Sequence, residues 1–133
     1  MKRAWLDVSG RVGVVALGAV MLGLGGCSHD YWVRFQFLTD APGDAVADRD
    51  RIEIPVGYAM AVRALPMRDD EELGADMEID LQSRRAGTLG LDHGLREREF
   101  VIFGADVGTT WVDVYFGDDY VTEIEARVVP AGD

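Results

Sequence analysis

The chain has 133 residues, in which 24 Asp and Glu outnumber 13 Lys and Arg to give a formal net charge of −11 at pH 7. A surface of this sign repels the phosphates of nucleic acids and anionic lipid headgroups, so the composition argues against a nucleic-acid-binding protein. One cysteine rules out a disulfide within the chain, and one cysteine with two histidines is too few for a metal site built on these ligands.

The first 26 residues have the three-part pattern of a secretory signal peptide. Lys2, Arg3 and Arg11 give a basic start, and residues 12–26 form an uncharged apolar run. This run has 15 residues, whereas a helix that spans a bilayer needs about 20. We therefore predict a cleaved segment. The alternatives are a short transmembrane anchor and an ordinary signal peptide in which Cys27 is an unmodified thiol.

The apolar run ends in Leu24-Gly25-Gly26-Cys27, which contains the sole cysteine. This tetrapeptide resembles the lipobox of bacterial lipoproteins. The resemblance implies that the signal peptide is cleaved before Cys27, that the Cys27 thiol carries a diacylglycerol through a thioether, and that the freed amine is acylated, for example with palmitate. Two or more acyl chains hold a protein stably on a membrane. Ser28 stands where many lipoproteins of the inner membrane carry Asp, which implies the outer membrane.

Residues 27–133 are then the mature protein, with 27–30 as a short tether and 31–133 as a single domain. Residues 1–26 hold three of the 13 basic and one of the 24 acidic residues. The mature part therefore has 10 basic and 23 acidic residues, which gives a formal net charge of −13. Its cysteine is joined to lipid and forms no disulfide, so apolar burial must stabilise the domain.

Short runs of alternating apolar and polar residues follow one another through the mature part, separated by turns rich in Gly, Pro and Asp. We expect strands at residues 31–37, 51–54, 58–65, 76–81, 89–91, 99–103, 109–116 and 120–129. Pro55 stops the second of these, which we interpret as a short edge strand. In the fourth, Met77, Ile79 and Leu81 share the inward face. The pattern predicts an all-β, antiparallel two-sheet β-sandwich of about seven to nine strands.

The order of small and apolar residues between 52 and 129 resembles the bacterial immunoglobulin-like domains of the group 2 type. The residues that carry the resemblance are Val56-Gly57, Ser83, Leu89-Gly90-Leu91-Asp92, Phe100, Gly104, Gly108-Thr109-Thr110 and Ala126-Arg127-Val128-Val129. Those domains often have a segment with proline after the serine, where this chain has Arg84-Arg85-Ala86. The resemblance implies an immunoglobulin-like β-sandwich of the kind found in envelope and surface proteins. It implies no ligand.

No pattern for nucleophilic catalysis is present. His29 lies in the tether, and His93 lies in an Asp-His-Gly turn, where a solvated turn residue is the simpler interpretation. The sequence has no Gly-x-Ser-x-Gly, phosphate-binding loop or His-Glu-x-x-His motif. A pair of carboxylates for glycoside hydrolysis could be drawn from so many acids by accident, so a hydrolase is the least favoured class.

Carboxylates are the one plentiful group that binds metals, and Asp44, Asp48 and Asp50 lie in one predicted loop. These three are the candidates for a calcium site, because calcium prefers oxygen ligands. They lack the ligand spacing of an EF-hand, and carboxylates without such spacing usually face water. Solvated surface is therefore the preferred interpretation, and no cofactor is expected.

Three aromatic residues are predicted to point away from the core. Trp32 alternates with Val33, and Trp111 and Tyr115 alternate with residues of the opposite face of their strand. Aromatic side chains are favoured anchors in interfaces, so the three are a possible interaction patch. The alternative is that the faces are reversed, or that these side chains cover an edge of the sandwich, because one β-bulge inverts the alternation.

We therefore expect an outer-membrane lipoprotein whose β-sandwich is a non-enzymatic interaction or structural module, with the membrane reached through lipidated Cys27 and an envelope protein as partner. The alternative is a calcium or small-ligand binder, or an inhibitor of an envelope enzyme, that uses an acidic loop.

Overall fold

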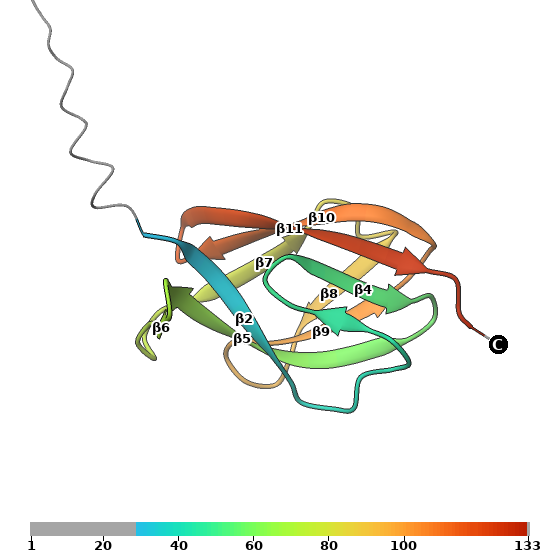
Figure 1. Cartoon of the computed structure of the whole chain (residues 1–133), viewed down its shortest axis with the longest axis horizontal. Coiled ribbons are helices and arrows are strands. Elements are labelled where there is room, and N and C mark those ends of the chain that lie inside the picture. The colour runs from blue at the N-terminus through green and yellow to red at the C-terminus, as the bar shows by residue number, and fades with distance from the viewer. Residues whose placement is uncertain (1–28, 133) are drawn as a thin grey trace, which may run out of the picture.

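In the computed structural model, which describes residues 29–132, the chain forms two β-sheets that pack face to face (Figure 1). The first, which we call the β5 sheet, has the strand order β2-β5-β9-β8, and β6 also pairs with β5. The second, the β10 sheet, has the order β3-β4-β11-β10-β7.

The strands of the β5 sheet are β2 (Tyr31–Phe37), β5 (Ala59–Arg68), β6 (Glu71–Glu72), β8 (Leu89–His93) and β9 (Glu99–Gly104). Those of the β10 sheet are β3 (Val46–Ala47), β4 (Arg51–Pro55), β7 (Ile79–Ser83), β10 (Gly108–Phe116) and β11 (Asp119–Val129).

The strand order is that of a constant-type immunoglobulin sandwich. Lettered along the chain, β2, β5, β9 and β8 occupy the places of strands A, B, E and D, and β7, β10 and β11 occupy those of C, F and G. The predicted all-β, two-sheet sandwich is therefore confirmed. Among the described residues, none forms a helix of the length and apolar character that crossing a bilayer requires.

One pair of strands contradicts the antiparallel prediction. β4 runs parallel to β11, with Arg51 opposite Glu125. Parallel strands need a connection much longer than a hairpin, and most of the domain separates these two. β4 is also not the edge strand that we predicted, because β3 pairs with its other side. Ile52 and Ile54 of β4 are consequently fully buried.

β5 continues beyond the predicted turn at Pro66 and forms a hairpin with β6. The Pro66 carbonyl accepts a hydrogen bond from the Leu73 N–H at 2.8 Å, on the side of β5 away from β2. The backbone nitrogen of a strand residue lies on the same side as its carbonyl, so the N–H that proline lacks is not needed for pairing with β2.

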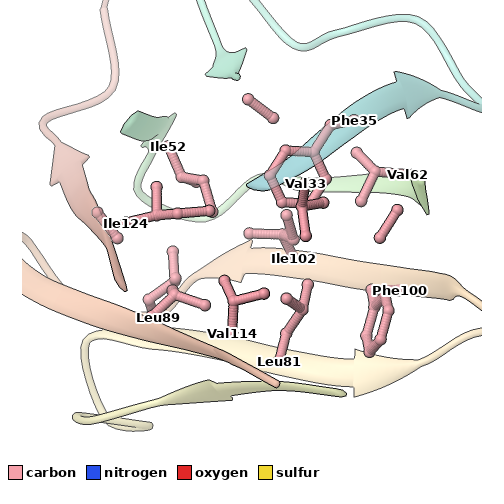
Figure 2. Packing of buried hydrophobic residues seen from close by; sticks show 14 of the residues in the cluster. Val33, Phe35, Ile52, Val62, Leu81, Leu89, Phe100, Ile102, Val114 and Ile124 are labelled. Atoms are coloured by element: carbon pink, nitrogen blue, oxygen red, sulfur yellow. The ribbon is translucent and has the colours of Figure 1, made fainter. Parts of the chain in front are cut away.

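Hydrophobic side chains from both sheets fill the space between them and form one core (Figure 2). On β10, Val112 and Val114 are fully buried, whereas Trp111 next to them faces away from the core and is 38% exposed. Each fully buried side chain of this kind stabilises the fold by about 1.5–3 kcal/mol. The largest fully buried side chains are Ile52, Ile54, Met60, Leu89, Ile102 and Ile124, together with Val33, Val62, Val112, Val114, Val128 and Pro66.

The core contains one polar side chain whose removal we expect to stabilise the protein. Thr110 is 4% exposed, and its Oγ1 has no hydrogen-bond partner among the described residues. A buried hydroxyl without a partner costs about 1–3 kcal/mol. We expect Thr110→Val, which replaces the hydroxyl by a methyl group, to raise the free energy of unfolding by about this amount in urea titrations.

The control is Thr109→Val, at an exposed position on the same strand, where we expect a change within about 0.5 kcal/mol. A loss of stability in Thr110→Val would mean that the hydroxyl has a bonding partner.

Candidate functional site

The first described residues are tied to the turn between β5 and β6, in an arrangement that we call the clasp. It consists of His29, Asp30, Trp32, Arg49 and Asp69. The Asp69 carboxylate accepts a hydrogen bond from the Asp30 N–H at 2.9 Å and lies 2.9 Å from the Nδ1 atom of His29. The Asp69 N–H donates to the Asp30 carbonyl at 2.7 Å. The Asp69 carbonyl accepts from the Trp32 indole N–H at 2.8 Å.

Arg49, from the turn between β3 and β4, completes the clasp. Its guanidinium carbon lies 4.3 Å from the centre of the Trp32 ring, and the same group pairs with the Asp30 carboxylate. An arginine over an indole ring is attracted by the electrons of the ring face. The clasp therefore joins three parts of the chain: the start of β2, the β3–β4 turn and the β5–β6 turn.

Asp69 suits this position for two reasons. It is one of two residues in the tight β5–β6 turn and has a φ of 54°, a left-handed conformation that Asp and Asn tolerate better than most residues. The hydrogen bond from the Asp30 N–H, with a second from His29, holds the pKa of the Asp69 carboxyl below its usual value of 3.8. The carboxylate of Asp69 is thus ionised throughout the neutral range.

The outer face of the β10 sheet carries the two other aromatic residues of the predicted patch. Trp111 and Tyr115 lie on the same face of β10, with Asp113 between them. The Tyr115 ring packs edge to face against the Tyr120 ring of β11, with 5.8 Å between ring centres. On the neighbouring strand β11, Glu125 lies directly opposite Trp111. This face therefore presents a line of aromatic and acidic side chains.

Arg84 neutralises the acids at the centre of that face. Its Nε and Nη2 atoms bind the Asp113 carboxylate at 2.7–3.2 Å, and Nη2 also binds Glu123 at 2.6 Å. These hydrogen bonds, which Arg84 donates to Asp113 above all and also to Glu123, raise the pKa of the guanidinium above its usual value. Arg84 follows directly after β7, so its side chain joins the end of β7 to β10 and β11.

The structure does not bring the three predicted patch residues together. Trp111 and Tyr115 belong to the β10 sheet, whereas Trp32 belongs to β2 of the β5 sheet and is engaged in the clasp. The clasp and the Arg84 network were not predicted, because their partners are 17 to 40 positions apart in the sequence. No local pattern could have revealed them. Only the register between strands does.

The candidate calcium ligands Asp48 and Asp44 also have different contacts. The Asp48 carboxylate accepts hydrogen bonds from the N–H groups of Asp50 and Arg51, at 2.8 and 2.9 Å, and so closes the β3–β4 turn. Asp44 instead lines a hollow of about 390 Å³ beside Tyr58. Across residues 29–132, no three His, Cys, Asp or Glu side chains are placed to hold one metal ion. That Asp44, Asp48 and Asp50 are solvated surface residues stays a prediction, with calcium binding as its alternative.

His93 is exposed at the end of β8. Its ring centre lies 5.3 Å from that of Phe100, and its Nε2 atom lies 3.9 Å from a carboxylate oxygen of Asp80. We predicted a turn at His93, whereas it is the last residue of β8 and packs against the core residue Phe100.

No protein-family model matches the chain, and no curated protein matches it. Among solved structures, the chain is similar to one described as the crystal structure of the S-layer protein SbsC domains 4 and 5. The two share 12% sequence identity with a TM-score of 0.48, over 89% of this chain and 83% of the other. The site is therefore interpreted from its own residues.

The lowered pKa of Asp69 predicts a pH dependence of stability. A carboxyl group whose pKa is lower in the folded state stabilises the fold above its unfolded pKa of about 3.9, and this contribution is lost as the pH falls through the folded pKa. We expect Asp69→Asn, which tolerates the same backbone conformation, to lower the melting temperature at neutral pH. The difference from the wild type should shrink below about pH 4.

Circular dichroism melting curves over the acidic range measure this difference. Asp70→Asn, the next residue of the same turn, is the control and should show little change at any pH. A deficit in Asp69→Asn that stays constant down to the lowest pH would mean that the charge of Asp69 does not stabilise the clasp.

Proposed function

We propose that the chain is a lipid-anchored lipoprotein of the bacterial envelope in which the β-sandwich is a non-enzymatic interaction or structural module. The observation that carries this proposal is the place of the sole cysteine. Cys27 ends an apolar run behind a basic start, as the lipobox resemblance requires. Ser28 favours the outer membrane by the same resemblance.

The clasp supports the proposal from the structural side. His29 and Asp30 are already bonded to Asp69, so the folded domain begins two residues after Cys27. A lipid on Cys27 would therefore hold the sandwich directly at the membrane surface, with no flexible linker of useful length. Such short attachment suits a module that acts at the membrane where it is anchored.

The outer face of the β10 sheet is the surface that we propose for an envelope protein partner. Trp111 is exposed on that face, and Arg84 holds the carboxylates of Asp113 and Glu123 by hydrogen bonds. Tryptophan is among the residues that contribute most to binding energy at interfaces. Side chains that are already held in place lose less entropy when a partner binds.

Cys27→Ala tests the anchor. We expect this variant to lose incorporation of labelled palmitate and to move from the membrane fraction to the soluble fraction, because the acyl chains supply the membrane affinity. Its circular dichroism spectrum should remain that of a folded β protein, since the core lies entirely after residue 30. Ser28→Ala is the control and should keep its label. Labelling that persists in Cys27→Ala would place the anchor elsewhere.

Trp111→Ala tests the interaction face. Some proteins will co-purify with the wild type from crosslinked envelopes, and we expect these proteins to be missing from the Trp111→Ala sample. A tryptophan anchor contributes about 2 kcal/mol or more to the binding free energy, which corresponds to about 30-fold in affinity. Tyr58→Ala, another exposed aromatic position, is the control. The melting temperature should stay close to that of the wild type in both variants. Recovery of the same proteins with Trp111→Ala would exclude this face as the contact.

A further inference from the structure

A second group of exposed aromatic side chains lies beside the clasp. Tyr31 is 41% exposed and Tyr120 is 53% exposed, and both line a shallow hollow of about 460 Å³. The other lining residues are Met77, Phe116, Asp119 and Val121. We call this end of the sandwich the clasp end.

The aromatic rings connect the clasp to the hollow. The His29 ring packs edge to face against Tyr31, with 6.2 Å between ring centres, and Tyr31 packs in the same way against Phe116 at 6.4 Å. Phe116 ends β10, and Tyr120 follows in the β10–β11 hairpin. The exposed tyrosines therefore lie at the point where the chain enters the domain, whereas β11 finishes at the opposite end (Figure 1).

We infer that the clasp end rests on a lipid surface, with Tyr31 and Tyr120 at the level of the lipid headgroups. This inference rests on the proposed anchor at Cys27. Cys27 is two positions before His29, and two residues reach at most about 7 Å. The clasp fixes His29 against Asp69, so an anchor on Cys27 leaves the clasp end no room to stand away from the bilayer.

The side chains at this end fit a membrane interface. Tyrosine has an apolar ring and a polar tip, and for this reason it is enriched where headgroups meet water. Partial desolvation, followed by the nearby carboxylates of Glu123 and Asp113, raises the pKa of the Tyr120 phenol above its usual value.

The charges at this end select the kind of lipid. Asp118 lies in the β10–β11 turn, and Asp119, the first residue of β11, lines the hollow. Carboxylates repel anionic headgroups. The surface therefore fits zwitterionic headgroups such as phosphatidylethanolamine.

Fluorescence quenching by lipids with brominated acyl chains tests the inference. The full chain is produced in a bacterial host, purified as the cell processes it, and reconstituted into phosphatidylethanolamine vesicles that contain these lipids. Tyr120→Trp places an indole at the clasp end. Tyr58→Trp is the matched control, because Tyr58 is 50% exposed and lines the hollow beside Val129 and Pro130, where β11 ends. Both variants retain the native tryptophans. The emission of these tryptophans is measured in the wild type under the same conditions and subtracted.

We expect brominated lipid to quench the added emission of Tyr120→Trp and to leave that of Tyr58→Trp unchanged. Replacement of phosphatidylethanolamine by phosphatidylglycerol should reduce the quenching. Equal quenching in the two variants, or stronger quenching on phosphatidylglycerol, would overturn the inference. Loss of Tyr120→Trp emission that rises with protein density and not with bromination would also overturn it, since a second copy would then cover the hollow.

Mass spectrometry of the same samples separates this inference from the proposed function. If Cys27 carries lipid and Tyr120→Trp is not quenched, the lipid contact is wrong while the lipoprotein proposal stands. If vesicle-bound protein has an unmodified Cys27, both are wrong.

Discussion

Apolar contact between the two sheets is the interaction on which the rest of this structure depends. The described domain contains no cysteine, so no covalent bond joins the β5 sheet to the β10 sheet. The first strands of the chain belong to different sheets. β2 pairs with β5 in the β5 sheet, whereas β4 pairs with β11 in the β10 sheet. Val33 and Ile52, one from each strand, are both fully buried in the same core. The core thereby fixes the point at which the chain enters the domain.

Two networks of polar contacts lie outside this core at the places that concern function. At one end, the five residues of the clasp tie the start of β2 to the β3–β4 and β5–β6 turns. On the outer face of the β10 sheet, Arg84 joins two carboxylates that would otherwise repel each other across β10 and β11. In our account the first place faces the membrane and the second faces a protein partner.

The alternation of residue types was sufficient to predict the fold class and most of its inward faces. Ile79 and Leu81 are buried as the sequence indicated, although β7 begins only at Ile79. The pattern failed where strands are too short to show a period, as in β3, and where pairing is parallel, as between β4 and β11. It could not reveal the clasp or the bonds of Arg84, because these depend on which distant strands become neighbours.

The central claim is that a lipid on Cys27 attaches the domain to the envelope, and mass spectrometry of the N-terminal peptide tests it most directly. The account predicts a peptide that begins at Cys27 and carries the mass of a diacylglycerol with a further acyl group on its amine. A peptide with an unmodified Cys27 thiol, still preceded by residues 1–26, would contradict it.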